Sequence, residues 1–127
     1  MSARARGYLE RHGRLTVTAV TVFERLRGYR AALRAGKPFE AQLHAFQGLV
    51  ASCVVLPLDT TAASRAAEIW AALDRRRRRV LADILIAAIA SVHELALVTR
   101  NRRDFAPIAA LDFAGLRLVD WTKDNRS

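Results

Sequence analysis

The sequence predicts an α/β fold in which a central parallel sheet is flanked by helices. Short runs of β-branched and apolar residues alternate along the chain with longer segments of helical periodicity. One of these segments, residues 81–93, is so uniformly apolar that it is expected to be buried on most sides. Strands that are separated by helices favour parallel pairing, with helices covering both faces of the sheet.

Length and composition bound the class of protein. The chain has 127 residues, of which 52% are hydrophobic, which fits one domain with its own core. The N-terminus lacks the apolar stretch of a signal peptide, and no apolar run reaches the length of a membrane span. The single cysteine, Cys53, excludes an internal disulfide and a cysteine-rich zinc site. We therefore expect one domain over residues 1–127, located in the cytoplasm, with no membrane partner.

The net charge of +9 points to a polyanionic partner. Nucleic acid is the first candidate for such a partner. Charge alone does not decide the matter, because coding sequences rich in G and C enrich arginine and alanine without any functional cause.

The first half of the chain predicts a helical hairpin between two strands. Thr18 or Thr21 can cap the first helix of this hairpin, and a Gly-Lys-Pro break at residues 36–38 ends it. In chain order, the expected elements are a helix over residues 3–12, a strand over 14–18, helices over 19–35 and 39–52, and a buried strand over 53–58.

The second half contains the most apolar helix and five consecutive arginines. The arginines, residues 75–79, follow a helix end, where cations complement the helix dipole or simply face solvent; the functional alternative is contact with an RNA backbone. In order, the expected elements are a helix from residue 59 or 60 to about 73, a helix over 81–93, a strand over 96–99, one short helical turn within 106–111 and a strand over 116–119.

Three carboxylates occupy places where a parallel sheet carries its reactive site. Glu24 follows the first strand, Asp83 opens the apolar helix and Asp104 lies just beyond the strand over 96–99. Such sites lie outside the carboxyl ends of strands, so the three side chains can meet there. Each also has a structural explanation, since Asp favours helix starts and Glu24 stands at capping-box spacing from Thr21. Only their joint placement favours a functional site.

Gathered carboxylates in a basic protein predict a metal site made of oxygen ligands. Carboxylates and waters suit Mg²⁺ or Mn²⁺, and no set of histidines and cysteines competes for zinc. Such an ion lowers the pKa of bound water and stabilises the developing charge of a phosphate, often as one of two ions about 3.5–4 Å apart. The chemistry that fits is hydrolysis of a phosphodiester.

Residues 15–121 resemble a PIN domain of the VapC type, the toxin half of a bacterial toxin–antitoxin pair. The resemblance rests on TAVTVFER around Glu24, ADILIAAIA around Asp83 and LVTRNRRDF over residues 97–105, and LRLVDW, ending at Trp121, is similar to the family's last strand. It implies a PIN-like three-layer fold and an endoribonuclease that depends on Mg²⁺ or Mn²⁺. It also implies a cognate antitoxin as the inhibiting partner, and a homodimer.

The resemblance also assigns roles to individual residues. Glu24 and Asp83 take the places of metal-site carboxylates. Asp104 is carried as a further charged contributor, Asn101 as a hydrogen-bonding or water-mediated one, and Thr99 as a residue that orients the others. The side chains expected to contact RNA are Arg75, Arg76, Arg77, Arg78, Arg79, Arg100 and Arg102.

The chain departs from the family at its start. The family's first buried strand ends in LDTN or LDTS, whose Asp is a central metal ligand, and no stretch of this sequence matches it. We therefore expect a domain that is truncated at its N-terminus relative to the family. The alternative function is an inactive PIN-like remnant that only binds antitoxin or RNA. A DNA-binding regulator ranks last, because no helix-turn-helix pattern is present.

Overall fold

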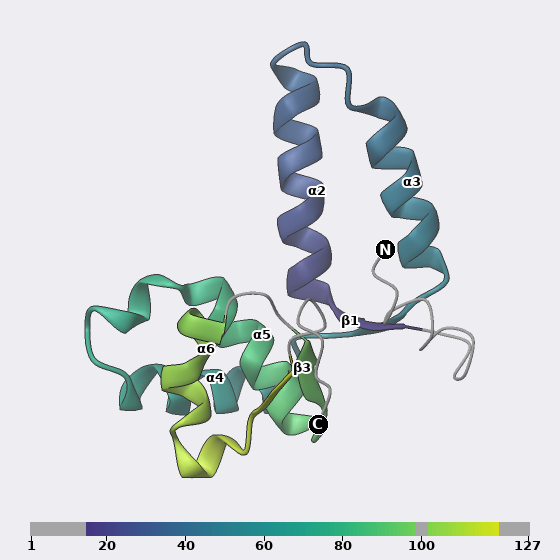
Figure 1. Ribbon diagram of the computed structural model, residues 1–127. Helices are drawn as coiled ribbons and strands as arrows, with labels where there is room; N and C mark the ends of the chain where they lie inside the picture. Colours follow the sequence, from purple (N-terminus) through teal and green to yellow (C-terminus); the bar gives the residue numbers. More distant parts are fainter. Residues whose placement is uncertain (1–14, 99–101, 120–127) are drawn as a thin grey trace, which may run out of the picture.

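The computed structural model describes residues 15–98 and 102–119 (Figure 1). The predicted helix over residues 3–12, and Trp121, lie outside these ranges. In chain order the elements are β1 (Thr16–Thr18), α2 (Ala19–Arg34), α3 (Glu40–Ala51), β2 (Val54–Leu56), α4 (Thr60–Ala72), the short 3₁₀ helix η1 (Arg77–Arg79), α5 (Leu81–Val92), β3 (Ala96–Val98), α6 (Arg102–Ala109), the 3₁₀ helix η2 (Asp112–Ala114) and β4 (Arg117–Val119).

Local sequence signals set the ends of α2. The Oγ1 atom of Thr18 accepts a hydrogen bond from the backbone N–H of Thr21 over 3.0 Å, so Thr18 is the N-cap. At the other end Gly36 has a φ of +81°, a conformation that glycine adopts without steric cost. The N–H of Lys37 then donates to the carbonyl of Ala32 over 3.0 Å, which completes a Schellman motif.

The helical hairpin of α2 and α3 projects from the rest of the molecule (Figure 1). No residue of α2 is buried, and α3 buries only Leu43. The two helices meet through aromatic rings, since the Tyr29 ring centroid lies 6.4 Å from that of Phe39 and 5.9 Å from that of Phe46. The hairpin therefore adds little to the main core.

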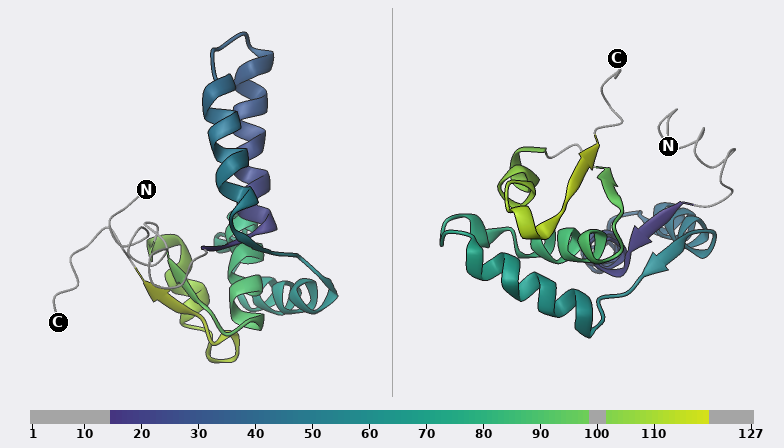
Figure 2. Two further views of the ribbon diagram at one scale, coloured as in Figure 1. Left: turned by 90° about the vertical axis from the view of Figure 1, so that its right-hand side faces the viewer. Right: turned by 90° about the horizontal axis from the view of Figure 1, so that it is seen from below.

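The core surrounds α5, as its apolar sequence predicts. Figure 2 shows α5 between α4 on one side and α6 with β4 on the other. Four isoleucines are almost fully buried: Ile69, Ile84, Ile89 and Ile108. Among the described residues, no helix is both long enough and apolar enough to cross a membrane.

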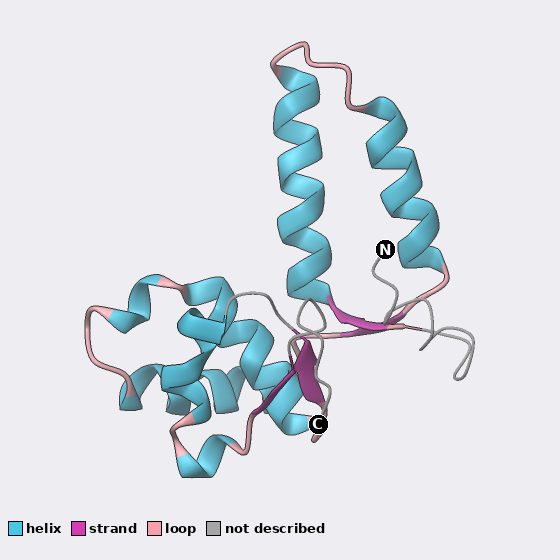
Figure 3. Ribbon diagram, viewed as in Figure 1, coloured by secondary structure: helices cyan, strands magenta, loops and turns pink. Residues whose placement is uncertain are grey.

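The strands form two separate parallel pairs instead of one continuous sheet. Thr16 of β1 lies opposite Val54 of β2, and Ala96 of β3 lies opposite Arg117 of β4. Figure 3 shows the pairs as distinct magenta segments. The predicted parallel pairing is thus present, but within the described residues β1 and β3 do not pair with each other. The expected central sheet is interrupted between them.

The helix α6 is longer than the single turn predicted within residues 106–111. It spans Arg102–Ala109 and contains Pro107. Proline inside a helix removes a hydrogen bond and clashes with the preceding turn, so the sequence indicated only a short turn here. Because α6 lies in the connection from β3 to β4, it supplies the crossover that parallel strands require.

Candidate functional site

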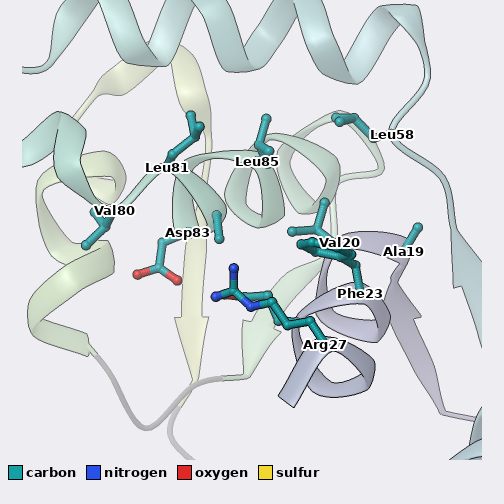
Figure 4. Close-up of a pocket in the computed structure, with 11 residues that line it drawn as sticks. Ala19, Val20, Phe23, Arg27, Leu58, Val80, Leu81, Asp83 and Leu85 are labelled. Atoms are coloured by element: carbon teal, nitrogen blue, oxygen red, sulfur yellow. The ribbon is translucent and has the colours of Figure 1, made fainter. Parts of the chain in front are cut away.

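A cavity of about 660 Å³ lies between the first turns of α2 and the beginning of α5 (Figure 4). Two of the carboxylates selected from the sequence, Glu24 and Asp83, line it together with Arg27. Its remaining walls are apolar and are formed by Ala19, Val20, Phe23, Leu58, Val80, Leu81, Ala82 and Leu85. The charged side chains of the cavity therefore lie beside an apolar wall, which limits their contact with water.

Glu24 is not part of the helix cap. Because Thr18 is the N-cap of α2, Glu24 lies more than one turn inside the helix, and the capping-box pairing with Thr21 is wrong. Its Oε2 atom lies 3.5 Å from the Nη2 atom of Arg27, one turn further along the same helix. The side chain of Glu24 is 31% exposed, so this ion pair is partly shielded from solvent. Helix capping therefore no longer accounts for this residue.

Asp83 stands at the centre of the acidic cluster. It lies in the first turn of α5 and is partly buried, and the helix has no side-chain cap. Burial raises the pKa of the Asp83 carboxyl above its ordinary value of 3.8, and the negative charges of Asp104 and Glu24 raise that pKa further. A helix N-terminus favours an anion, but here desolvation and like charges outweigh that effect.

Asp104, the third carboxylate of the cluster, lies in α6, the helix that follows β3 in the chain. It lies in the first turn of α6 and is partly buried, and its neighbour Phe105 is 4% exposed and belongs to the core. Phe105 anchors this turn, which holds Asp104 close enough to raise the pKa of Asp83 more than Glu24 does. The structure thus brings three carboxylates from three different helices within electrostatic range of one another.

The described carboxylates do not already form a closed metal-binding group. In the part of the chain that the structure describes, no three His, Cys, Asp or Glu side chains are arranged to hold an ion. The predicted site residues Thr99 and Asn101 lie outside that part, as does Arg100. The donor chemistry nevertheless fits a divalent cation, because carboxylate oxygens are the ligands such ions prefer and a cation would relieve the repulsion that Asp104 and Glu24 exert on the Asp83 carboxylate.

Arg27 is a site residue that the sequence analysis missed. Figure 4 shows its guanidinium and the Asp83 carboxylate pointing toward one another across the cavity. The signal available in the sequence was its position three residues after Glu24, which places both side chains on one helix face. Its guanidinium also lies 5.5 Å from the ring centroid of Phe23, which is 59% exposed.

The arginine run divides into residues with different surroundings. The guanidinium of Arg78 lies 3.9 Å from the Trp70 ring centroid and donates to the carbonyl of Trp70 over 2.9 Å, at the C-terminal end of α4. Arg77 pairs with Asp74 over 3.5 Å, and both side chains are 58% exposed. Arg75 and Arg76 are also exposed. The side chains of Arg79 and Arg102 are not among those that the structure describes.

Comparisons with known proteins agree with this architecture. The sequence matches the PIN domain over residues 1–111. The structure is similar to a chain of the DNA-bound VapBC complex from Salmonella typhimurium, with 30% identity, a TM-score of 0.74 and coverage of 93% of this chain and 83% of that chain. It is also similar to a chain of VapBC-1 from nontypeable Haemophilus influenzae, with 23% identity, a TM-score of 0.70 and coverage of 87% and 76%. No curated protein matches the sequence. The predicted PIN-like α/β fold is confirmed.

Proposed function

This chain belongs to the PIN-domain family and is of the VapC type, and from that premise we propose that it is an endoribonuclease toxin that depends on Mg²⁺ or Mn²⁺. The observation that carries the proposal is the electrostatic coupling of Asp83 to Asp104 and Glu24. A partly buried carboxylate beside two further negative charges, as Asp83 is, is costly in a protein without a cation to neutralise them. Their meeting beside a cavity favours a site for a divalent ion over a purely structural role.

In this proposal Asp83, Asp104 and Glu24 would hold the ion. Asn101 and Thr99 would act beside them, through hydrogen bonds or a bridging water and by orienting the other groups. A bound divalent ion supplies an activated water and neutralises charge on the phosphodiester. The chain's own contribution is to bring the carboxylates together, where a bound cation would offset the burial and the negative charges that raise the pKa of Asp83. The apolar walls of the cavity limit competing hydration there.

Arginines supply the affinity for RNA in this account. The Arg27 guanidinium, which points across the cavity toward Asp83, is placed to bind a phosphate oxygen close to the site of cleavage. The exposed side chains of Arg75, Arg76 and Arg77 lie in the segment that leads into α5 and its Asp83. Contact between these arginines and phosphates would make RNA binding weaken steeply as salt concentration rises. Arg79, Arg100 and Arg102 are proposed to contribute in the same way.

We propose that this chain binds the same kind of partner as the similar proteins do. The two similar structures are VapBC complexes, so a cognate antitoxin is proposed as the protein that inhibits this chain. A homodimer is proposed as its oligomeric state, and the cytoplasm as the place where it meets RNA.

RNA cleavage by the full chain tests the proposal. The wild type, Asp83→Asn and a control variant, Asp112→Asn, are incubated with RNA in Mg²⁺ or Mn²⁺, with EDTA as the metal-free arm. Asp112 is exposed in η2, outside the acidic cluster. We expect Asp83→Asn to lose about 10²-fold or more of the cleavage rate, as for other groups that stabilise transition-state charge. Cleavage that survives both EDTA and Asp83→Asn would exclude this site.

A second candidate is a protein that binds antitoxin or RNA without cleaving it. The observation in its favour is that the described carboxylates do not form a ready group of three around an ion. Such a protein would bind RNA with the same affinity in EDTA and in Mg²⁺, and Asp83→Asn would leave that affinity unchanged. Cleavage in Mg²⁺ would exclude this candidate.

A further inference from the structure

A second cavity, of about 640 Å³, lies between the C-terminal end of α4 and the helix α6. Its charged groups are the exposed side chains of Asp74, Arg77 and Arg103. The remaining residues that line it are apolar: Ala72, Leu73, Ala106, Pro107, Ala110 and Leu111. Sites for small ligands have volumes of about 300–1,000 Å³ and combine an apolar lining with a few polar groups, and this cavity has both properties.

The two arginines of this cavity favour an anionic ligand. Arg77 comes from η1 and Arg103 from the first turn of α6, so two separate segments direct guanidinium groups at one space. The carbonyl groups that end α4 carry partial negative charge and would repel an anion. Arg78 donates to the carbonyls of Trp70 and Ala71 over 2.9 and 3.4 Å, which offsets that charge. The chemistry therefore fits a phosphate group, which guanidinium groups bind well.

Asp74 adds a hydrogen-bond acceptor to the same cavity. Its Oδ1 atom accepts a hydrogen bond from the backbone N–H of Arg77 over 3.0 Å, and its Oδ2 atom lies 3.5 Å from Nη1 of Arg77. These contacts hold the carboxylate in place and offset its charge. Its side chain is nevertheless 58% exposed, so its oxygens can accept a further hydrogen bond from a ligand. A hydroxyl group is the donor that suits a carboxylate beside a phosphate site.

The cavity is connected along the chain to the acidic cluster on both of its sides. Arg103 immediately precedes Asp104 in α6. Arg77 lies in η1, which leads directly into α5 and its Asp83. A nucleotide that flanks the scissile phosphate of a bound strand is therefore the ligand that this location favours.

We propose that this second cavity binds a ribonucleotide of the substrate strand beside the cleavage position, an inference that rests on the proposed function. Arg77 and Arg103 would bind phosphate oxygens, and Asp74 would accept a hydrogen bond from the ribose 2′-OH. The base would lie against the apolar lining. Because DNA lacks the 2′-OH, Asp74 would make the cavity prefer RNA to DNA.

Binding of single strands to the full chain in EDTA tests the proposal, because the proposed cleavage requires a divalent ion. The probes are a fluorescent oligouridylate of about eight nucleotides and an oligodeoxyuridylate of the same length, which differ only in the 2′-OH. Fluorescence anisotropy gives the Kd of each. We expect the wild type to bind the RNA about fivefold more tightly than the DNA, as one hydrogen bond would provide. Absence of RNA binding would overturn the proposal.

Two arginine variants test the phosphate contacts. Arg103→Gln removes a charge from the cavity, and Arg30→Gln removes one from an exposed position in α2 that does not line it. We expect Arg103→Gln to weaken RNA binding about tenfold and to lower the slope of log Kd against log salt concentration by about 0.7, the value for one phosphate contact. Arg30→Gln should change the Kd about twofold or less. Equal effects of the two variants would overturn the proposal.

Two variants of Asp74 test the contact with the 2′-OH. Asp74→Ala should reduce the preference for RNA over DNA to about onefold, whereas Asp74→Asn, which keeps an acceptor oxygen, should retain the preference. The preference is a ratio of two Kd values for one protein, so the loss of a negative charge, which affects both probes, cancels. An unchanged preference in Asp74→Ala would overturn the proposal.

These binding results are separable from nuclease activity. If the variants behave as expected but the wild type leaves RNA intact in Mg²⁺ and Mn²⁺, the nucleotide site stands and the proposed cleavage fails. If the wild type cleaves RNA but Arg103→Gln binds it as tightly as the wild type does, the nucleotide site alone is overturned.

Discussion

Replacing Arg78 by alanine tests whether this arginine stabilises the fold. Its guanidinium lies 3.9 Å from the Trp70 ring centroid, a contact worth about 0.5–1 kcal/mol at an exposed site. It also donates to the carbonyls of Trp70 and Ala71 over 2.9 and 3.4 Å, and losing these bonds costs about 1 kcal/mol more. We therefore expect Arg78→Ala to lower the free energy of unfolding by about 2 kcal/mol.

Urea denaturation and calorimetry measure this change. For a chain of 127 residues, the entropy of unfolding is about 270 cal/mol/K, so 2 kcal/mol corresponds to a fall in Tm of about 7 °C. The matched control is Arg77→Ala, which breaks the exposed ion pair with Asp74 and should cost about 0.5 kcal/mol or less. Equal losses of stability in the two variants would refute the structural role given to Arg78.

Two further predictions concern the ends of α5. Glu94 has a φ of +55° in the turn that closes α5, so Glu94→Gly should raise the free energy of unfolding by about 1 kcal/mol in urea titrations, and an unchanged midpoint would contradict this. The pKa of Asp83 is higher in the folded chain than its ordinary value of 3.8, so folding binds protons and stability falls as pH rises from that value through the raised pKa. Metal-free Asp83→Asn should therefore be more stable than the wild type at pH 7. This difference should shrink as pH falls through the raised pKa and be lost below 3.8, and a difference independent of pH would rule out the raised pKa.

The helices were predictable because their signals are local. Thr18 caps α2 and Gly36 ends it, while Asp59 caps α4 by accepting a hydrogen bond from the N–H of Ala62 over 2.9 Å. The apolar run of α5 predicted its burial. The extent of α6 could not be predicted from the sequence, because packing of Phe105 and Ile108 into the core outweighs the local cost of Pro107.

The interruption of the sheet and part of the site depend on contacts that no local pattern encodes. Each strand has three residues, and whether β1 and β3 acquire a common neighbour is a property of the whole sheet. The rule that sites lie at the carboxyl ends of parallel strands selected Glu24, Asp83 and Asp104. Arg27 was missed because its position beside Asp83 arises from the contact between α2 and α5.

Direct binding of Mn²⁺ to the full chain, followed by electron paramagnetic resonance, tests the central claim that these carboxylates share one ion. The account predicts saturable binding by the wild type, a loss of affinity of about tenfold or more in Asp83→Asn, and no change in Asp112→Asn. Equal affinity in all three proteins would contradict it, because the ion would then bind elsewhere on the chain.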